Sequence, residues 1–196
     1  MPVTYTNRKG TAYYLCQGLT KTGKLRYYFA REPKDDSPTQ IPDGYRISES
    51  VNGTVSLIKD QPQLILPQES AAVEKALSRH PKSNAYRMAI KNNRIIIYER
   101  LGPDLEMLGA ILEGFSPLPA TVVRKRLQEQ FEKTGRFSPI LRFILADPKE
   151  HTFIVERRVY LGTIEDWIEI GVSGKLAKIA RQLILKLGTD EFFELY

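Results

Sequence analysis

Alternating apolar and polar residues dominate the first 60 positions and predict two β-hairpins. Residues 11–31 carry strand-forming aromatic residues on both sides of a turn that contains Gly23. Residues 45–59 hold Asn52-Gly53 between two alternating runs. This pair is typical of a type I′ turn, in which both central residues have positive φ. We therefore expect a small four-stranded β-module over residues 1–60.

Alternation also assigns the side chains of the first hairpin to two faces, because successive strand residues point to opposite sides. We expect one face to be buried, and it holds Tyr13, Leu15, Leu25, Tyr27 and Phe29. The other face holds Tyr14, Cys16, Arg26 and Tyr28.

A change of hydrophobic period follows the proline-flanked segment 60–67 and predicts a second domain over residues 64–196. Helical spacing indicates helices over 68–79, 103–115 with Pro103 as the first residue, and 121–134 with Gly135 as C-cap. Hairpins are expected at 85–100, around Asn92-Asn93, and at 139–161.

Two further helices are expected near the end of the chain. Thr163 and Asp166 resemble a capping box for a short helix that carries Ile164, Trp167 and Ile168. Ser173 would cap the last long helix, which ends at Gly188. Its apolar stripe predicts a core face, made of Leu176, Ile179, Ala180, Leu183, Ile184 and Leu187.

These elements define an α+β fold: a β-module of two hairpins, then a domain whose antiparallel sheet of two hairpins is covered by helices. The order helix, hairpin, helix occurs twice in the second domain. Similar strand sequences, residues 97–102 and 154–157, suggest an internal repeat.

Composition excludes several classes of protein. A hydrophobic fraction of 42% is sufficient for a core, and no apolar run reaches the length of a membrane helix. The opening residues lack the apolar segment of a signal peptide, so we expect a cytoplasmic protein without membrane insertion. One cysteine and two widely separated histidines give no metal-ligand spacing, and we expect no metal or cofactor.

The positive charge is concentrated at the N-terminus. The first 34 residues hold seven basic side chains and one acidic one, which accounts for the whole formal net charge of +6. Such asymmetry points to an anionic partner, nucleic acid first. We predict sequence-tolerant nucleic-acid binding, with phosphate contacts from cations and stacking from tyrosines. The candidate residues are Tyr14, Lys21, Lys24, Arg26, Tyr28 and Arg31.

Residues 18–24 match the first part of a nucleotide-binding P-loop, G-x-x-x-x-G-K. The next residue is Leu25, so the hydroxyl that would bind Mg²⁺ is missing, and a strand follows where the motif requires a helix. A glycine-containing hairpin turn accounts for the same residues, and ATP or GTP binding is excluded here.

Two alternatives remain open beside non-catalytic nucleic-acid binding. The first is a protein-interaction or self-association module that acts through the α+β domain and the apolar C-terminal tail. The second is a metal-dependent nuclease, because Asp147 with Glu156 and Arg158 imitates the D…E-x-K arrangement of one nuclease class. In that alternative the two carboxylates would hold Mg²⁺.

Overall fold

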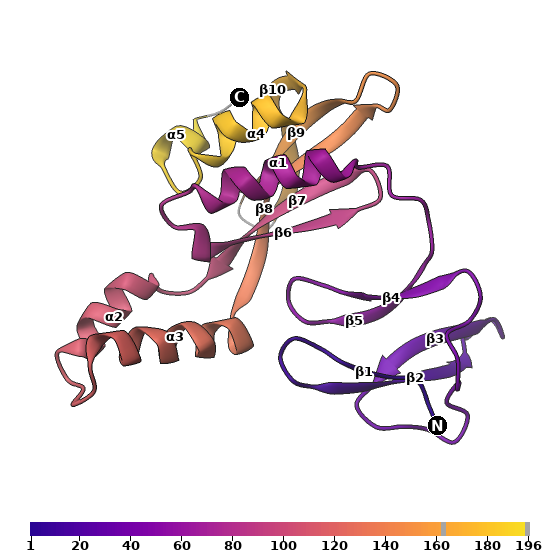
Figure 1. Cartoon of the computed structure of the whole chain (residues 1–196). Helices are drawn as coiled ribbons and strands as arrows, with labels where there is room; N and C mark the ends of the chain where they lie inside the picture. The colour runs from indigo at the N-terminus through magenta and orange to yellow at the C-terminus, as the bar shows by residue number, and fades with distance from the viewer. Residues whose placement is uncertain (162–163, 195–196) are drawn as a thin grey trace. The chain divides into compact units, whose positions relative to one another are not determined.

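A computed structural model describes residues 1–161 and 164–194 (Figure 1). The chain divides into two compact units, each made of two segments. Unit 1 comprises Met1–Asp60 and Leu101–Arg136, and unit 2 comprises Gln61–Arg100 and Phe137–Tyr196. Both contain helices and antiparallel strands, which confirms the α+β class.

Unit 1 contains two small antiparallel sheets and a helical hairpin. The strands are β1 (Thr4–Thr6), β2 (Ala12–Leu19), β3 (Leu25–Ala30), β4 (Tyr45–Glu49) and β5 (Val55–Lys59). Their orders are β1-β2-β3 and β4-β5, so both expected hairpins are present and β1 is an additional strand. The helices are α2 (Leu105–Glu113), which begins two residues after Pro103 with Asp104 as N-cap, and α3 (Ala120–Thr134), for which Gly135 is the C-cap.

The three strand connections of these sheets share one turn geometry. In each, a glycine with φ between 77° and 79° donates its N–H to the carbonyl three residues earlier: Gly10 to Asn7, Gly23 to Thr20, Gly53 to Ser50. This is a three-residue loop that ends in a left-handed glycine. The type I′ expectation for Asn52-Gly53 was wrong, since only Gly53 has positive φ. Val51 precedes that pair inside the loop and is buried, so packing selects the longer loop.

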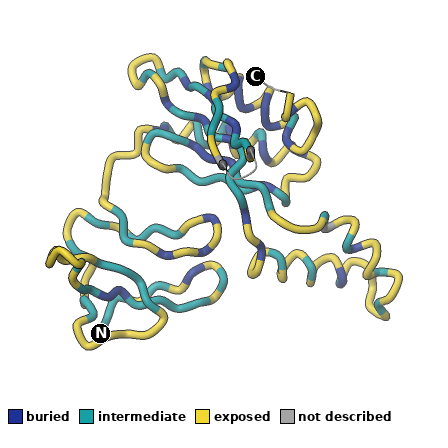
Figure 2. The backbone as a smooth tube through the Cα atoms, turned by 180° about the vertical axis from the view of Figure 1, so that it is seen from behind, coloured by how far each residue is buried: buried dark blue, intermediate teal, exposed yellow. Residues whose placement is uncertain are grey.

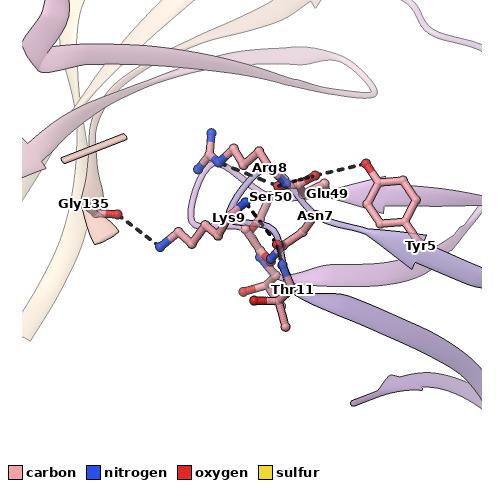
Figure 3. A network of polar contacts seen from close by, with 10 residues as sticks. Tyr5, Asn7, Arg8, Lys9, Thr11, Glu49, Ser50 and Gly135 are labelled. Atoms are coloured by element: carbon pink, nitrogen blue, oxygen red, sulfur yellow. Dashed lines mark hydrogen bonds and ion pairs between the residues drawn. The ribbon is translucent and has the colours of Figure 1, made fainter. Parts of the chain in front are cut away.

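Asn7 joins two of these turns (Figure 3). Its side chain is 5% exposed, and its Nδ2 donates to the Gly53 carbonyl at 2.7 Å. Its Oδ1 accepts from the backbone N–H groups of Lys9 and Thr11 at 3.0 and 2.9 Å. Glu49 adds a second link, because it accepts from the Tyr5 hydroxyl at 3.0 Å and the Arg8 N–H at 3.1 Å. Buried polar groups thus tie the first sheet to the second.

Unit 2 is built on one five-stranded sheet of order β10-β9-β8-β7-β6. The strands are β6 (Tyr86–Lys91), β7 (Arg94–Leu101), β8 (Arg136–Asp147), β9 (Thr152–Leu161) and β10 (Ile164–Gly174). The helices are α1 (Pro67–Ser78), the 3₁₀ turn η1 (Ser83–Ala85), α4 (Leu176–Ile184) and α5 (Asp190–Phe193). The two expected hairpins are β6-β7 and β8-β9, and β10 extends the sheet beyond them.

Helices α1 and α4 lie side by side on one face of this sheet (Figure 1). All six residues of the stripe expected in the last long helix are buried, and they join one core with Val73 and Leu77 of α1. The sheet contributes alternate residues, such as Ile95 and Ile97 of β7 and Phe143 of β8. Figure 2 shows buried positions gathered along α4 and the strands beneath it, whereas α2 and α3 are largely exposed.

The short helix expected at residues 163–168 was wrong, because Trp167 and Ile168 lie in β10, paired with Arg158 and Arg157 of β9. The Thr163 part of that expectation falls outside the described residues. Ser173 also lies in β10, and α4 begins after Lys175 without a side-chain cap. Pairing with β9 therefore overrides the local helical spacing.

Replacement of Asn7 with Ala should destabilise the β-strands of unit 1 by about 2 kcal/mol, because it leaves the buried Gly53 carbonyl and two N–H groups without their partner. Hydrogen exchange of the β1, β2, β4 and β5 amides would measure the loss. The exposed Asn84→Ala is the matched control and should leave that exchange unchanged. Equal protection in the two variants would contradict the role given to Asn7.

Candidate nucleic-acid interface

The register of β2 with β3 confirms the two predicted faces of the first hairpin. Leu15 pairs with Phe29 on one face, and Cys16 pairs with Tyr28 on the other. The first face packs inward, as shown by the edge-to-face contact between the Tyr27 and Tyr45 rings at 6.0 Å. Leu25 is an exception to the expected burial: it is 55% exposed, because it lies next to the turn at the end of the hairpin.

The middle of the second face is covered by the segment after β3. Cys16 is fully buried, and its Sγ contacts the Glu32 carbonyl oxygen at 3.9 Å and the Ser37 Oγ at 3.7 Å. Tyr14, the next residue of this face, is half-buried. The accessible side chains of this face are therefore those toward the turn: Arg26, which is exposed, and Tyr28, which is half-buried.

Two cations surround the Tyr28 ring. The Arg26 guanidinium carbon lies 5.2 Å from the ring centroid, and the Lys34 Nζ lies 5.4 Å from it. The Tyr28 side chain also raises the pKa of Lys34 above its ordinary value. Lys34 is absent from the residues selected from sequence, although it belongs to the basic N-terminal segment. Its place on the ring becomes visible only when the chain folds back after β3.

The remaining candidate cations lie at the turn and after β3. Lys21 and Lys24 belong to the turn, where the Thr20 Oγ1 accepts from the Lys24 N–H at 3.1 Å and contacts the Thr22 Oγ1 at 3.0 Å. Arg31 follows β3 directly and is exposed. These bonds hold the turn backbone while both lysine side chains extend into solvent.

The seven N-terminal cations fall into two groups. Arg8 pairs with Glu49 at 3.7 Å, and the Lys9 Nζ donates to the Gly135 carbonyl at 3.3 Å, so both serve unit 1 internally (Figure 3). In the part of the chain that the structure describes, the other five have no ion pair with an acid: Lys21, Lys24, Arg26, Arg31 and Lys34. The first hairpin thus exposes Lys21, Lys24 and Arg26 without acids in its own sequence, whereas the segment after it carries Glu32, Asp35 and Asp36 beside Arg31 and Lys34.

Asp147 lies apart from the other two residues of the nuclease alternative, Glu156 and Arg158, which are neighbours on one face of β9. The Asp147 Oδ1 accepts from the Lys149 and Glu150 N–H groups at 2.8 and 3.1 Å, which closes the β8-β9 turn. Glu156 pairs with Arg142, five positions before Asp147 on β8, so the backbone positions of Asp147 and Glu156 are separated by about four to five residues, roughly 13–17 Å, along the strands. Arg158 donates to the Ser138 Oγ at 2.8 Å. Asp147 and Glu156 therefore have separate partners and do not form one site. The nuclease alternative stays a prediction.

Within residues 1–161 and 164–194, no three His, Cys, Asp or Glu side chains form a group that could hold a metal ion. The helices of this described part are also too short or too polar to cross a membrane. Comparison of the chain with protein-family models, curated proteins and solved structures found no significant match. Arguments about function therefore rest on the geometry of the chain itself.

The carboxyl group of Asp147 should titrate below its ordinary pKa of 3.8, because the Glu150 and Lys149 N–H groups stabilise the ionised form. Its contribution to folding stability should be complete above the ordinary pKa and lost as the pH falls through the lowered value. Carbon-detected NMR titration of the side chain measures this midpoint. A midpoint at or above 3.8 would contradict the effect given to the two N–H groups, whereas a joint change in the Asp147 and Glu156 carboxyl signals on addition of Mg²⁺ would favour the nuclease alternative.

Proposed function

We propose that this protein binds nucleic acid without catalysis of its own, through the exposed cations of its first hairpin. The observation that carries the proposal is the group of five cations without an acidic partner among the described residues, on β3, its turn and the segment after it. Cations of this kind neutralise phosphates and release condensed counterions, which drives binding that depends strongly on salt.

Tolerance of nucleic-acid sequence is part of the proposal. Phosphate contacts position a protein on nucleic acid but carry no sequence information. Tyr28, the aromatic residue at the centre of the cation cluster, is flanked by Arg26 and Lys34, and Tyr14 is half-buried. The hairpin is therefore better suited to backbone contact than to reading bases. We place this activity in the cytoplasm, in keeping with a chain whose single cysteine, Cys16, is a buried free thiol.

The double variant Lys21→Gln with Lys24→Gln should weaken binding to duplex and single-stranded DNA and RNA alike. The slope of log binding constant against log salt concentration should become shallower by about 2, because two phosphate contacts are lost. Fluorescence polarisation of labelled oligonucleotides at several salt concentrations measures both quantities.

The double variant Lys125→Gln with Lys133→Gln on α3 is the matched control, since it removes the same charge from two other exposed lysines. An equal loss of affinity in the two variants would show that net charge alone drives binding. Absence of binding by the unmodified chain at low salt would overturn the proposed function.

A second candidate function, self-association, is favoured by one specific observation on unit 1. Helix α2 and the connection after it expose large apolar side chains: Met107 of α2 is 66% exposed, and Phe115, two residues after the helix ends, is 86% exposed. Beside it, a hollow of about 570 Å³ is lined mainly by apolar residues of α2, α3 and their connection, including Leu112, Leu118 and Leu127. Contiguous apolar surface of this kind marks contact sites between proteins. The apolar C-terminal tail offers less surface for self-association, because its Phe192 is buried in the core of unit 2.

Self-association predicts that light scattering gives a mass above the monomer for the unmodified chain. The double variant Met107→Ser with Phe115→Ser should return it to the monomer, because the exposed apolar surface of α2 is lost. Leu185→Ser, at an exposed apolar position of unit 2, should keep the assembly. A monomer at the highest soluble concentration, or an assembly lost only on truncation before Thr189, would contradict assembly through α2.

A further inference from the structure

The face of the five-stranded sheet opposite α1 and α4 contains a hollow of about 450 Å³. Its volume falls within the range of pockets that hold small ligands. Its lining comes entirely from unit 2 and consists of Lys91, Asn92, Asn93, Arg94, Ile96, Tyr98, Pro139, Arg142 and Trp167. Residues of β7 reach it because they alternate with the core residues Ile95 and Ile97.

The side chains that line this hollow are mainly cationic, aromatic and amide groups. Among the residues whose side chains the structure describes, the lining supplies three cations, two aromatic rings and two amides, and no carboxylate. Arg142 is neutralised by Glu156, its cross-strand partner. Lys91 and Arg94 have no hydrogen-bond or ion-pair partner for their side chains among the described residues. The hollow therefore suits a ligand that combines a negative charge with a flat apolar surface.

The flat surface is provided by a stacked pair of side chains. The Arg142 guanidinium carbon lies 4.3 Å from the centroid of the Trp167 ring, and Glu156 holds that guanidinium through its Nε. The half-buried Tyr98, whose pKa is raised by burial, also lines the hollow. Aromatic rings and guanidinium planes are the surfaces on which proteins stack unpaired bases.

The cationic side of the hollow is held by backbone bonds. The Asn92 carbonyl accepts from the Leu64 N–H at 3.3 Å, and the Asn93 carbonyl accepts from the Leu145 N–H at 2.8 Å. These two residues form the β6-β7 turn, with Lys91 and Arg94 as the pair that closes it. The turn therefore presents both cations from a fixed backbone, which lowers the entropy cost of ligand binding.

We propose that this hollow binds one nucleotide of a single-stranded nucleic acid, with the base on the Arg142-Trp167 pair and the phosphate between Lys91 and Arg94. The inference rests on the proposed function, because it specifies the form of nucleic acid that is bound. Duplex is disfavoured, because its bases are stacked on one another and present only their edges. A separate site on unit 2 thus adds strand selectivity to the charge of the hairpin.

Trp167 is the one tryptophan of the chain, so intrinsic fluorescence reports directly on this site. Titration of the full chain with an oligothymidylate of about 12 nucleotides should quench Trp167 saturably. A duplex of equal length should bind without this quenching, and thymidine monophosphate should quench only at much higher concentration. Equal quenching by the monophosphate and the oligomer would overturn the assignment to a single strand in favour of a free nucleotide.

The double variant Lys91→Gln with Arg94→Gln keeps the fluorophore and should weaken oligothymidylate binding about tenfold or more, with duplex binding unchanged. Trp167→Leu should weaken it by a similar factor, the range expected for one stacked base. Lys125→Gln with Lys133→Gln is again the matched control for charge.

The outcomes separate this inference from the proposed function. If polarisation detects binding that requires Lys21 and Lys24, while Trp167 fluorescence stays constant and Lys91→Gln with Arg94→Gln has no effect, the proposed function stands and the hollow is not a nucleotide site. If oligothymidylate quenches Trp167 but replacing Lys21 and Lys24 changes nothing, the hollow stands and the hairpin is not the interface. Absence of binding in both measurements overturns both.

Discussion

The packing of α1 and α4 on one face of the five-stranded sheet is the interaction on which unit 2 depends. It buries alternate residues of each strand, among them Ile95 and Ile97 of β7 and Phe143 of β8. Because strand side chains alternate, the same packing places the residues between them on the opposite face. Tyr98 and Arg142 are therefore displayed as a consequence of how the core is formed.

The elements that could be predicted from sequence are those determined by local signals, namely hydrophobic alternation, turn residues and helical spacing. The first hairpin and the β6-β7 hairpin follow from alternation interrupted by Gly23 and by Asn92-Asn93, and the α4 stripe from helical spacing. The predictions were wrong where tertiary contacts, rather than the local sequence, determine the local structure. Trp167 and Ile168 have the spacing of a helix, yet they pair with Arg158 and Arg157 of β9, and this pairing makes β10 a strand. Similarly, the Asn52-Gly53 pair suggested a two-residue loop, but burial of Val51 favours a longer one.

The candidate interface was predictable only in part, for the same reason. A count of charges identifies the basic N-terminal segment, but it cannot distinguish cations that the fold uses from those it leaves exposed. Arg8 is paired because Glu49, 41 residues later, is brought beside it by the Asn7 network. The hollow on unit 2 was not predictable at all, since Arg94 and Trp167 come from β7 and β10 and share a lining only through the order of the sheet.

The two proposed surfaces would differ in the physical origin of their attraction for nucleic acid. In the proposed function, the charge on the hairpin would act through counterion release, which weakens as salt rises for single strands and at least as steeply for duplex. Stacking on the Arg142-Trp167 pair depends mainly on contact between flat surfaces, and it requires a base that is free of its neighbours. Raising salt should therefore remove the contribution of Lys21 and Lys24 before that of the hollow. Selectivity for single strands should therefore increase with salt while total affinity falls.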